Sequence, residues 1–214
     1  MKLNSVIFAD DSESCDIADF CVLLKNSTFH VLEQYVSSCD NIDLNNKVCL
    51  SDYITKGNLS DELALINNDN FICFWYGHGN TDSFCIDNES IITTTENHYI
   101  FSNALIYTFS CFNGGELADV LIANNAKTFV GYTGFANCPY GIGDITLNVS
   151  MTFIESFIKG KTVNESKEDL IASYENAIFN EELEPFQRLS FQQNRDNLIV
   201  KGNGNLCIDD MLTA

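Results

Sequence analysis

The segment FICFWYGHGN (residues 71–80) decides the fold class, because a run of aromatic and β-branched residues stops abruptly at a histidine between two glycines. Such a run predicts a strand that is buried on both faces. A second apolar run, LIYTFSCFNGG (residues 105–115), ends in the same manner at a cysteine. Strand patterns of this kind alternate with helical patterns along the chain, which favours a mainly parallel sheet with helices on both faces. The expected fold class is therefore α/β, a three-layer α/β/α sandwich.

The other elements are expected from the spacing of apolar residues and from helix caps. Strands are predicted at 5–10, 29–36, 71–77, 104–110 and 126–135, with shorter ones at 48–50 and within 197–209. Helices are predicted at 14–25, 114–125, 141–161 and 164–178, and another that carries Leu59, Leu63 and Ile66 begins at Asn58 or Ser60. The length also allows two small domains, but no proline-rich linker or internal repeat divides the chain, so one domain over residues 1–214 is expected.

The chain is strongly acidic. Its 30 acidic and 11 basic residues give a formal net charge of −19, which makes contact with a phosphate backbone unfavourable. Nucleic acid is therefore not an expected partner, whereas a basic substrate or a basic partner protein suits this charge. No apolar stretch is long enough to cross a membrane, and the first residues lack the apolar segment of a secretory signal. We predict a cytoplasmic protein that does not contact membranes.

The nine cysteines are predicted to remain reduced. Their number is odd, and Cys21, Cys73 and Cys207 lie within apolar runs, where a free thiol behaves as a small hydrophobic side chain. The chain has no CxxC pair and only three histidines, so neither a structural zinc ion nor a cofactor is expected.

His78 and Cys111 are the candidate catalytic residues, because each directly follows a predicted strand of the sheet. Functional groups gather at the carboxyl ends of parallel strands, so two neighbouring strands would bring a thiol and an imidazole together. The N–H groups of Gly79 and Cys111 are candidates for an oxyanion hole. A single buried cysteine or a single histidine is more often structural, and it is their joint position that indicates catalysis.

These segments together resemble the cysteine peptidases of the caspase, gingipain and separase clan (clan CD), and most closely the CHAT domains of bacterial caspase-like proteases. Strand-His-Gly is followed by strand-Ser-Cys, as in that clan. Residues 115–131, 151–177 and 199–208 are similar to later parts of CHAT domains. The last of these carries Gly-Asn-Gly where such domains usually have Gly-Asp-Pro, so this match is loose. The resemblance covers most of the chain from about residue 70 and, more weakly, the first strand.

This resemblance implies the caspase-haemoglobinase fold and hydrolysis of peptide bonds in a protein or peptide substrate. Cys111 would attack the scissile carbonyl, and His78 would protonate the leaving amine. In this clan the residue after the first strand and the residue two before the cysteine line the S1 pocket, which implies Asp10 (or Asp11) and Phe109 here. An acid at that position would select Arg or Lys at P1.

Two further points on the substrate pocket come from the sequence. Asn137 and Asp144, in and after the loop that follows the strand at 126–135, are candidates for the border of the pocket. Asp10 and Asp11 also have a common structural interpretation, in which they only cap the first helix.

Two other classes of function compete with an active endopeptidase. The first is a proteolytically silent CHAT-like interaction module, although a silent copy needs neither His78 nor Cys111. The second is a flavodoxin-like nucleotide binder, but ADDSES (residues 9–14) has no glycine and makes a poor phosphate cradle. For an active enzyme, the family implies activation by a ligand or a partner protein, and analogy implies antiviral defence or regulated proteolysis.

Overall fold

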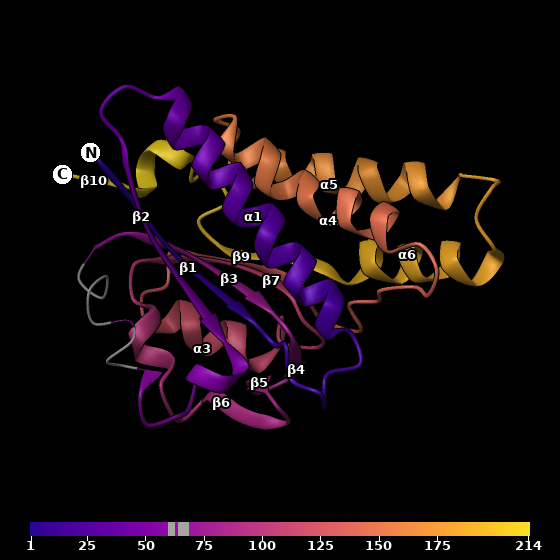
Figure 1. Cartoon of the computed structure of the whole chain (residues 1–214), viewed down its shortest axis with the longest axis horizontal. Coiled ribbons are helices and arrows are strands. Elements are labelled where there is room, and N and C mark those ends of the chain that lie inside the picture. The colour runs from indigo at the N-terminus through magenta and orange to yellow at the C-terminus, as the bar shows by residue number, and fades with distance from the viewer. Residues whose placement is uncertain (60–62, 64–68) are drawn as a thin grey trace.

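The computed structural model describes residues 1–59, 63 and 69–214, which form a mixed α/β structure around a mainly parallel sheet (Figure 1). Strand β1 pairs with β2 on one side and with β3 on the other, and the sheet continues through β7 and β8 to β9. β1, β2, β3, β7 and β8 are parallel, whereas β9 and the short β10 are antiparallel to their neighbours. The strands are β1 (Lys2–Ala9), β2 (Asp43–Leu50), β3 (Phe71–Tyr76), β7 (Ala104–Phe109), β8 (Thr128–Tyr132), β9 (Leu198–Gly202) and β10 (Leu212–Thr213).

Both faces of this sheet are covered (Figure 1). One face carries α1 (Ala18–Ser38), α4 (Gly143–Ile158), α5 (Val163–Ile178) and α6 (Pro185–Asn197). The other face carries α3 (Glu116–Ala123) and a three-stranded antiparallel sheet of β4 (His78–Asn80), β5 (Ser83–Ile86) and β6 (Glu89–Thr93). Three short 3-10 helices lie among the described residues: η1 (Ser51–Tyr53), η2 (His98–Phe101) and η3 (Ile208–Met211). The predicted α/β class with a mainly parallel sheet is confirmed.

Successive side chains of the central strands point to opposite faces and enter two separate cores. In β3, Phe74 and Tyr76 belong to the core under α1 and α4, whereas Cys73 and Trp75 belong to the core that includes α3 and the small sheet. Trp75 stacks on Phe84 of β5 with ring centroids 4.6 Å apart. Because both faces are buried, the strand reads in sequence as an uninterrupted apolar run.

The prediction of a strand at 29–36 is wrong, because these residues continue α1 as far as Ser38. The buried side chains of α1 include Leu24, Thr28 and Leu32, spaced four residues apart, so one helical face packs on the sheet along its length. This tertiary packing outweighs the local β propensity of the segment. The strand that follows is β2, which is longer than the predicted 48–50 because its polar residues lie at the edge of the sheet.

Two differences concern the last part of the chain. Helix α6 was not predicted, although Pro185 at its first turn and the bond from Glu184 N to Gln187 Oε1 (2.9 Å) are ordinary start signals. Of the two short strands predicted within 197–209, only β9 forms. The chain then passes through η3, and β10 pairs with β1. Ser60 and Ile66 of the helix predicted after residue 58 lie outside the described residues.

Candidate active site

The two candidate catalytic residues leave the sheet side by side. β3 and β7 are paired in parallel, with Tyr76 opposite Phe109, as the dyad prediction requires. One residue further on, Gly77 N donates to Phe109 O at 3.4 Å, so the pairing persists up to the positions of His78 and Cys111. The backbone of His78 is held in turn by Trp75, whose Nε1 donates to the His78 carbonyl at 3.4 Å. Both residues therefore start from the carboxyl edge of adjacent strands.

Gly79 packs directly against the chain around Cys111. A Cβ atom at Gly79 would lie 2.8 Å from the Cys111 carbonyl oxygen and 2.8 Å from Asn113 Nδ2, and it would overlap Ser110 Oγ. Ser110 Oγ and Asn113 Nδ2 are buried, and neither has a hydrogen-bond partner within the described ranges. The glycine is needed for this close approach, which places the backbone of Gly79 directly against the segment from Ser110 to Asn113.

Cys111 itself is half-buried, and its surroundings disfavour the thiolate. Burial raises the pKa of Cys111, and the opposing effect is a weak hydrogen bond from Ala136 N to Cys111 Sγ at 3.5 Å. The next residue, Phe112, has a φ of 62°, which is strained for a bulky side chain. It is held there by the bond from its N–H to Gly134 O (2.8 Å) and by the Phe135 ring, 4.7 Å away. Strain of this kind is concentrated at functional turns.

The His78 side chain belongs to a group that the sequence did not reveal. One ligand-capable atom each from Asp10, Cys15 and His78 lies within 4.8 Å of the other two. Gly77 makes this possible, because a Cβ atom there would lie 2.9 Å from Asp10 Cβ. Cys15 is buried in the turn between β1 and α1, a segment with no periodicity or motif that could have singled it out. In this conformation His78 is grouped with Cys15, and Cys111 is not a member of the group.

Asp10 is not an open substrate-binding acid. Its side chain is completely buried, Oδ1 accepts bonds from Ser12 N (3.2 Å) and Ser12 Oγ (2.6 Å), and Oδ2 accepts one from Asp87 N (3.2 Å). It is not a helix cap either, because α1 begins at Ala18 after Ile17 without a side-chain cap. The sequence could not separate these roles, since all of them place an acid after the first strand.

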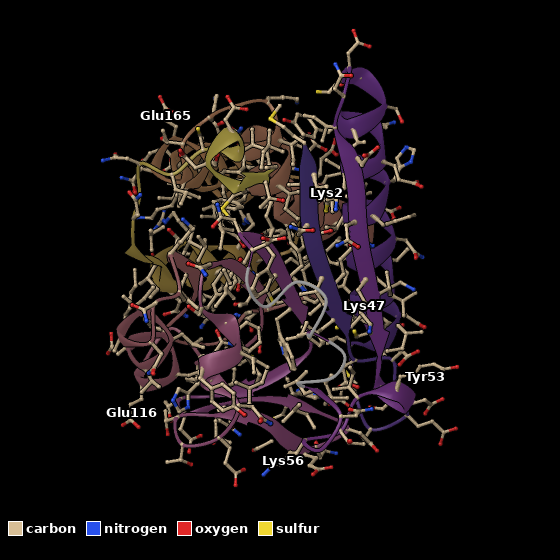
Figure 2. All side chains as sticks on the ribbon, turned by 90° about the vertical axis from the view of Figure 1, so that its left-hand side faces the viewer. Lys2, Lys47, Tyr53, Lys56, Glu116 and Glu165 are labelled. Carbon is tan, nitrogen blue, oxygen red and sulfur yellow. The ribbon has the colours of Figure 1, made fainter. Side chains whose placement is uncertain are left out.

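An acidic pocket lies beside this group instead, defined here as the cavity of about 460 Å³ lined by Asp11, Ser12, Glu13, Ser51, Asp52 and Asp87. The Asp11 carboxylate accepts a bond from Ser51 N at 2.9 Å, and the Asp87 carboxylate accepts one from Ser14 Oγ at 2.8 Å. Tyr53, which directly follows the pocket residue Asp52 in η1, is exposed and projects from the surface (Figure 2). Asp11 is thus the one of the two predicted acids that faces a cavity.

The other predicted pocket residues lie elsewhere. Phe109 is completely buried, with its ring 5.2 Å from that of Phe20 and 5.8 Å from that of Tyr132, so it supports the core and not an open pocket. Asp144 is exposed in the first turn of α4. Asn137 is held by α6, because its N–H donates to Asn194 Oδ1 at 2.7 Å. None of the three lines the acidic pocket.

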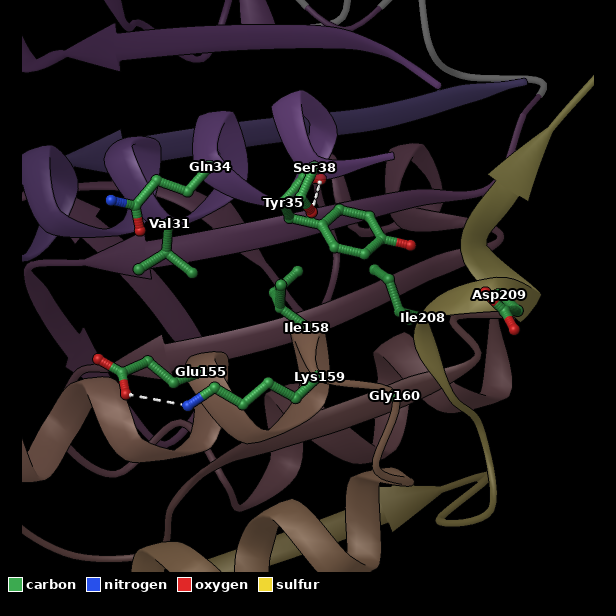
Figure 3. A pocket seen from close by; sticks show the side chains of 10 residues that line it. All are labelled: Val31, Gln34, Tyr35, Ser38, Glu155, Ile158, Lys159, Gly160, Ile208 and Asp209. Carbon is green, nitrogen blue, oxygen red and sulfur yellow. Dashed lines mark hydrogen bonds and ion pairs between the residues drawn. The ribbon is translucent and has the colours of Figure 1, made fainter. Parts of the chain in front are cut away.

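A second cavity, of about 630 Å³, shares no lining residue with the acidic pocket and is lined by neither His78 nor Cys111 (Figure 3). It opens between the last turns of α1 and α4 and the η3 turn, and no histidine or cysteine lines it. Its lining residues are Val31, Gln34, Tyr35, Ser38, Glu155, Ile158, Lys159, Gly160, Ile208 and Asp209. It therefore lacks the thiol and the imidazole of the candidate dyad.

Comparisons with known proteins leave the site to be interpreted from its geometry. No protein-family model matches the chain, and no curated protein matches it. Among the described residues, no helix combines the length and the apolar character that a membrane span requires.

Proposed function

We propose that this protein is a cysteine endopeptidase of the caspase-like type, with Cys111 as nucleophile and His78 as general acid and base. The observation that carries the proposal is the parallel pairing of β3 with β7, which starts both residues from the same edge of adjacent strands. The close packing of Gly79 on Ser110 and Cys111 supports a shared oxyanion site. The fold and the strained turn at Phe112 agree with this function.

In the proposed reaction, the Cys111 thiol transfers its proton to His78, and the sulfur attacks the carbonyl carbon of the scissile peptide. The N–H groups of Gly79 and Cys111 stabilise the oxyanion of the tetrahedral intermediate. His78 then gives its proton to the leaving amine, which departs and leaves a thioester on Cys111. Water, deprotonated by His78, hydrolyses the thioester and regenerates the thiol.

The conformation described above is a latent one under this proposal. Burial raises the pKa of Cys111, so its thiol is protonated at neutral pH. His78 is also grouped with Asp10 and Cys15. A ligand or a partner protein would have to turn His78 towards Cys111, and the region of Phe112 and Phe135 would have to admit the substrate. This supports a protease that is active only after such a signal.

The acidic pocket supports cleavage after Arg or Lys. It presents carboxylates from Asp11, Glu13, Asp52 and Asp87. The backbone N–H of Asp87 donates to the carboxylate of Asp10, which lies near His78. A guanidinium or ammonium group is the natural counterpart of such a site, because charge-assisted hydrogen bonds to carboxylates are strong and directional. We therefore assign the basic P1 side chain to this pocket, with Asp11 as its acid in place of the buried Asp10.

The test is turnover of fluorogenic peptides with Arg, Lys, Asp or Leu at P1 by the parent, Cys111→Ala and His78→Ala, with Cys207→Ala as a matched control. Activity after Arg or Lys that is lost in the first two variants and kept in the control supports the proposal. If the parent is inactive, a peptide with a thiol-directed electrophile decides the matter. The labelling is done at alkaline pH, because the raised pKa of Cys111 leaves little thiolate at neutral pH. Labelling of Cys111 that an unlabelled Arg peptide prevents indicates a latent protease, whereas labelling that the Arg peptide does not affect, or no labelling, indicates a silent interaction module. Labelling of Cys15 would contradict the assigned dyad.

A further inference from the structure

We propose that Asp10, Cys15 and His78 bind one Zn²⁺ ion that holds the active site in its latent form. These residues come from three places in the chain: the end of β1, the turn before α1, and the start of β4. One ligand-capable atom of each lies within 4.8 Å of the other two. Ligand atoms of a tetrahedral zinc ion are about 3 to 4 Å apart, so the group needs only small side-chain rotations to close on a metal.

The donor set selects the metal. A thiolate, an imidazole and a carboxylate are the three ligand types that Zn²⁺ takes, and three protein ligands leave a fourth position for water. Mg²⁺ and Ca²⁺ prefer shells made of oxygen atoms and do not suit a site with a sulfur and a nitrogen ligand. The acidic pocket nearby attracts cations in general, but among the residues that the structure describes only this group combines the three donor types.

The surroundings of the three residues resemble the outer shell of a metal site. The Asp10 carboxylate is oriented by bonds from Ser12 and from Asp87 N, and it keeps lone pairs free for a further partner. Outer partners of this kind fix ligand orientation and contribute to metal affinity. His78 is half-buried, so the group has a side from which an ion can enter.

A bound ion would inhibit the peptidase because it occupies the imidazole of His78. When the ion binds, the Cys15 thiol releases its proton to solvent, and an imidazole nitrogen of His78 donates its lone pair to the metal. That imidazole can then neither accept a proton from Cys111 nor deliver one to a leaving amine. Only this inhibitory consequence rests on the proposed peptidase function, since metal binding itself does not depend on it.

The experiment uses Co²⁺ as a spectroscopic probe on the whole chain, followed by competition with Zn²⁺. We expect Co²⁺ to bind with a sulfur-to-cobalt charge-transfer band in the near ultraviolet, and one equivalent of Zn²⁺ to remove it. In Cys15→Ser, Asp10→Asn and His78→Gln, affinity should fall by more than about 100-fold, because loss of a ligand costs more than loss of an outer-shell partner. Cys207→Ser and Cys111→Ser are the controls and should keep the band.

The proposal is overturned if the parent shows no such band, or if Cys15→Ser keeps it. If Cys15→Ser keeps the band and Cys111→Ser loses it, the metal binds the proposed nucleophile instead of Cys15. Circular dichroism checks folding, and His78→Gln decides the question if the buried Cys15 variant does not fold. Metal binding together with no peptidase activity after the ion is chelated, and with no peptide-specific labelling of Cys111, would remove the proposed function and keep the site. Peptidase activity in a chain that binds no metal would remove only the site.

Discussion

Gly79 on β4 lies so close to Ser110 that a single methyl group on its α-carbon would overlap the Ser110 hydroxyl. The chain segments of the two candidate catalytic residues are therefore in direct van der Waals contact, although His78 and Cys111 are far apart in sequence. Gly79 has no left-handed backbone angle that would demand glycine, so the lack of a side chain matters here only for the close approach.

We expect Gly79→Ala to unfold more easily and to lose activity. The added methyl group must push β4 away from Ser110 and Asn113, and overpacking of this kind costs about 1 to 3 kcal/mol in the free energy of unfolding. The same displacement moves one oxyanion donor, so turnover of an Arg peptide should fall by about 100-fold. Urea unfolding and peptide hydrolysis measure the two effects.

Gly143→Ala is the matched control for that variant. Gly143 begins α4, and a Cβ atom there would have nothing within 4 Å. We expect it to leave activity unchanged and to stabilise the protein by up to about 1 kcal/mol, as alanine does in an unstrained helical position. Equal effects of the two substitutions would contradict the close packing at Gly79.

Alkylation of Cys111 is expected to be slow at neutral pH and to accelerate into the alkaline range. Burial raises its pKa, and a raised pKa means a smaller fraction of thiolate at every pH below it. The rate of reaction with iodoacetamide, followed by peptide mapping, should still rise above pH of about 8.5, where an unperturbed thiol is already half ionised. A rate that levels off below that pH would show that Cys111 is activated in the resting protein.

A change in the acidic pocket is expected to alter substrate choice. Asp52→Asn and Asp11→Asn, combined, should lower kcat/KM for Arg peptides by about tenfold or more while leaving Leu peptides unaffected, because charge-assisted bonds to the substrate are lost. The preference for Arg should also weaken at high salt, since these carboxylates border solvent. Glu168→Gln combined with Glu181→Gln, both exposed and outside the pocket, controls for the loss of two negative charges. Equal losses for Arg and Leu peptides would exclude the pocket as the P1 site.

The bond between Thr28 and Tyr76 joins α1 to the end of β3. Their hydroxyl oxygens are 2.6 Å apart and buried. Tyr76→Phe should lower the free energy of unfolding by about 1 kcal/mol, because a buried hydroxyl loses its partner. Together with Thr28→Val it should cost less than the sum of the two single changes, whereas Tyr99→Phe at an exposed position should stay within about 0.5 kcal/mol of the parent. Additive effects of the pair in urea unfolding would mean that the hydroxyls do not interact.

The parts of the site that could be predicted are those that depend on strand periodicity. The apolar runs that end at His78 and Cys111 indicated two strands buried on both faces, and alternation with helices indicated a parallel sheet. Two such strands present their carboxyl ends at one edge when they are neighbours, and they are neighbours. Local pattern therefore placed each residue at the carboxyl end of its strand, and the pairing of β3 with β7 in the structure placed both at a common edge.

The side-chain partners of those residues could not be predicted. Asp10 is an acid after the first strand in any interpretation, and only the position of Ser12 and Asp87 shows that it is buried and hydrogen-bonded. Cys15 has no sequence signal, because it lies near His78 only where the turn before α1 comes close to the start of β4. The same limit applies to residues 29–36, whose helical state depends on packing under the sheet.

By itself, the sequence determined the α/β class, the strands that carry His78 and Cys111, and the edge of the sheet where they lie, because buried strands and helices impose their periods on neighbouring residues. The tertiary structure alone decided that α1 extends to Ser38, that Asp10 turns inward, and that His78 is grouped with Cys15. These outcomes depend on contacts between distant segments, whose free energies exceed the local propensities of the residues concerned.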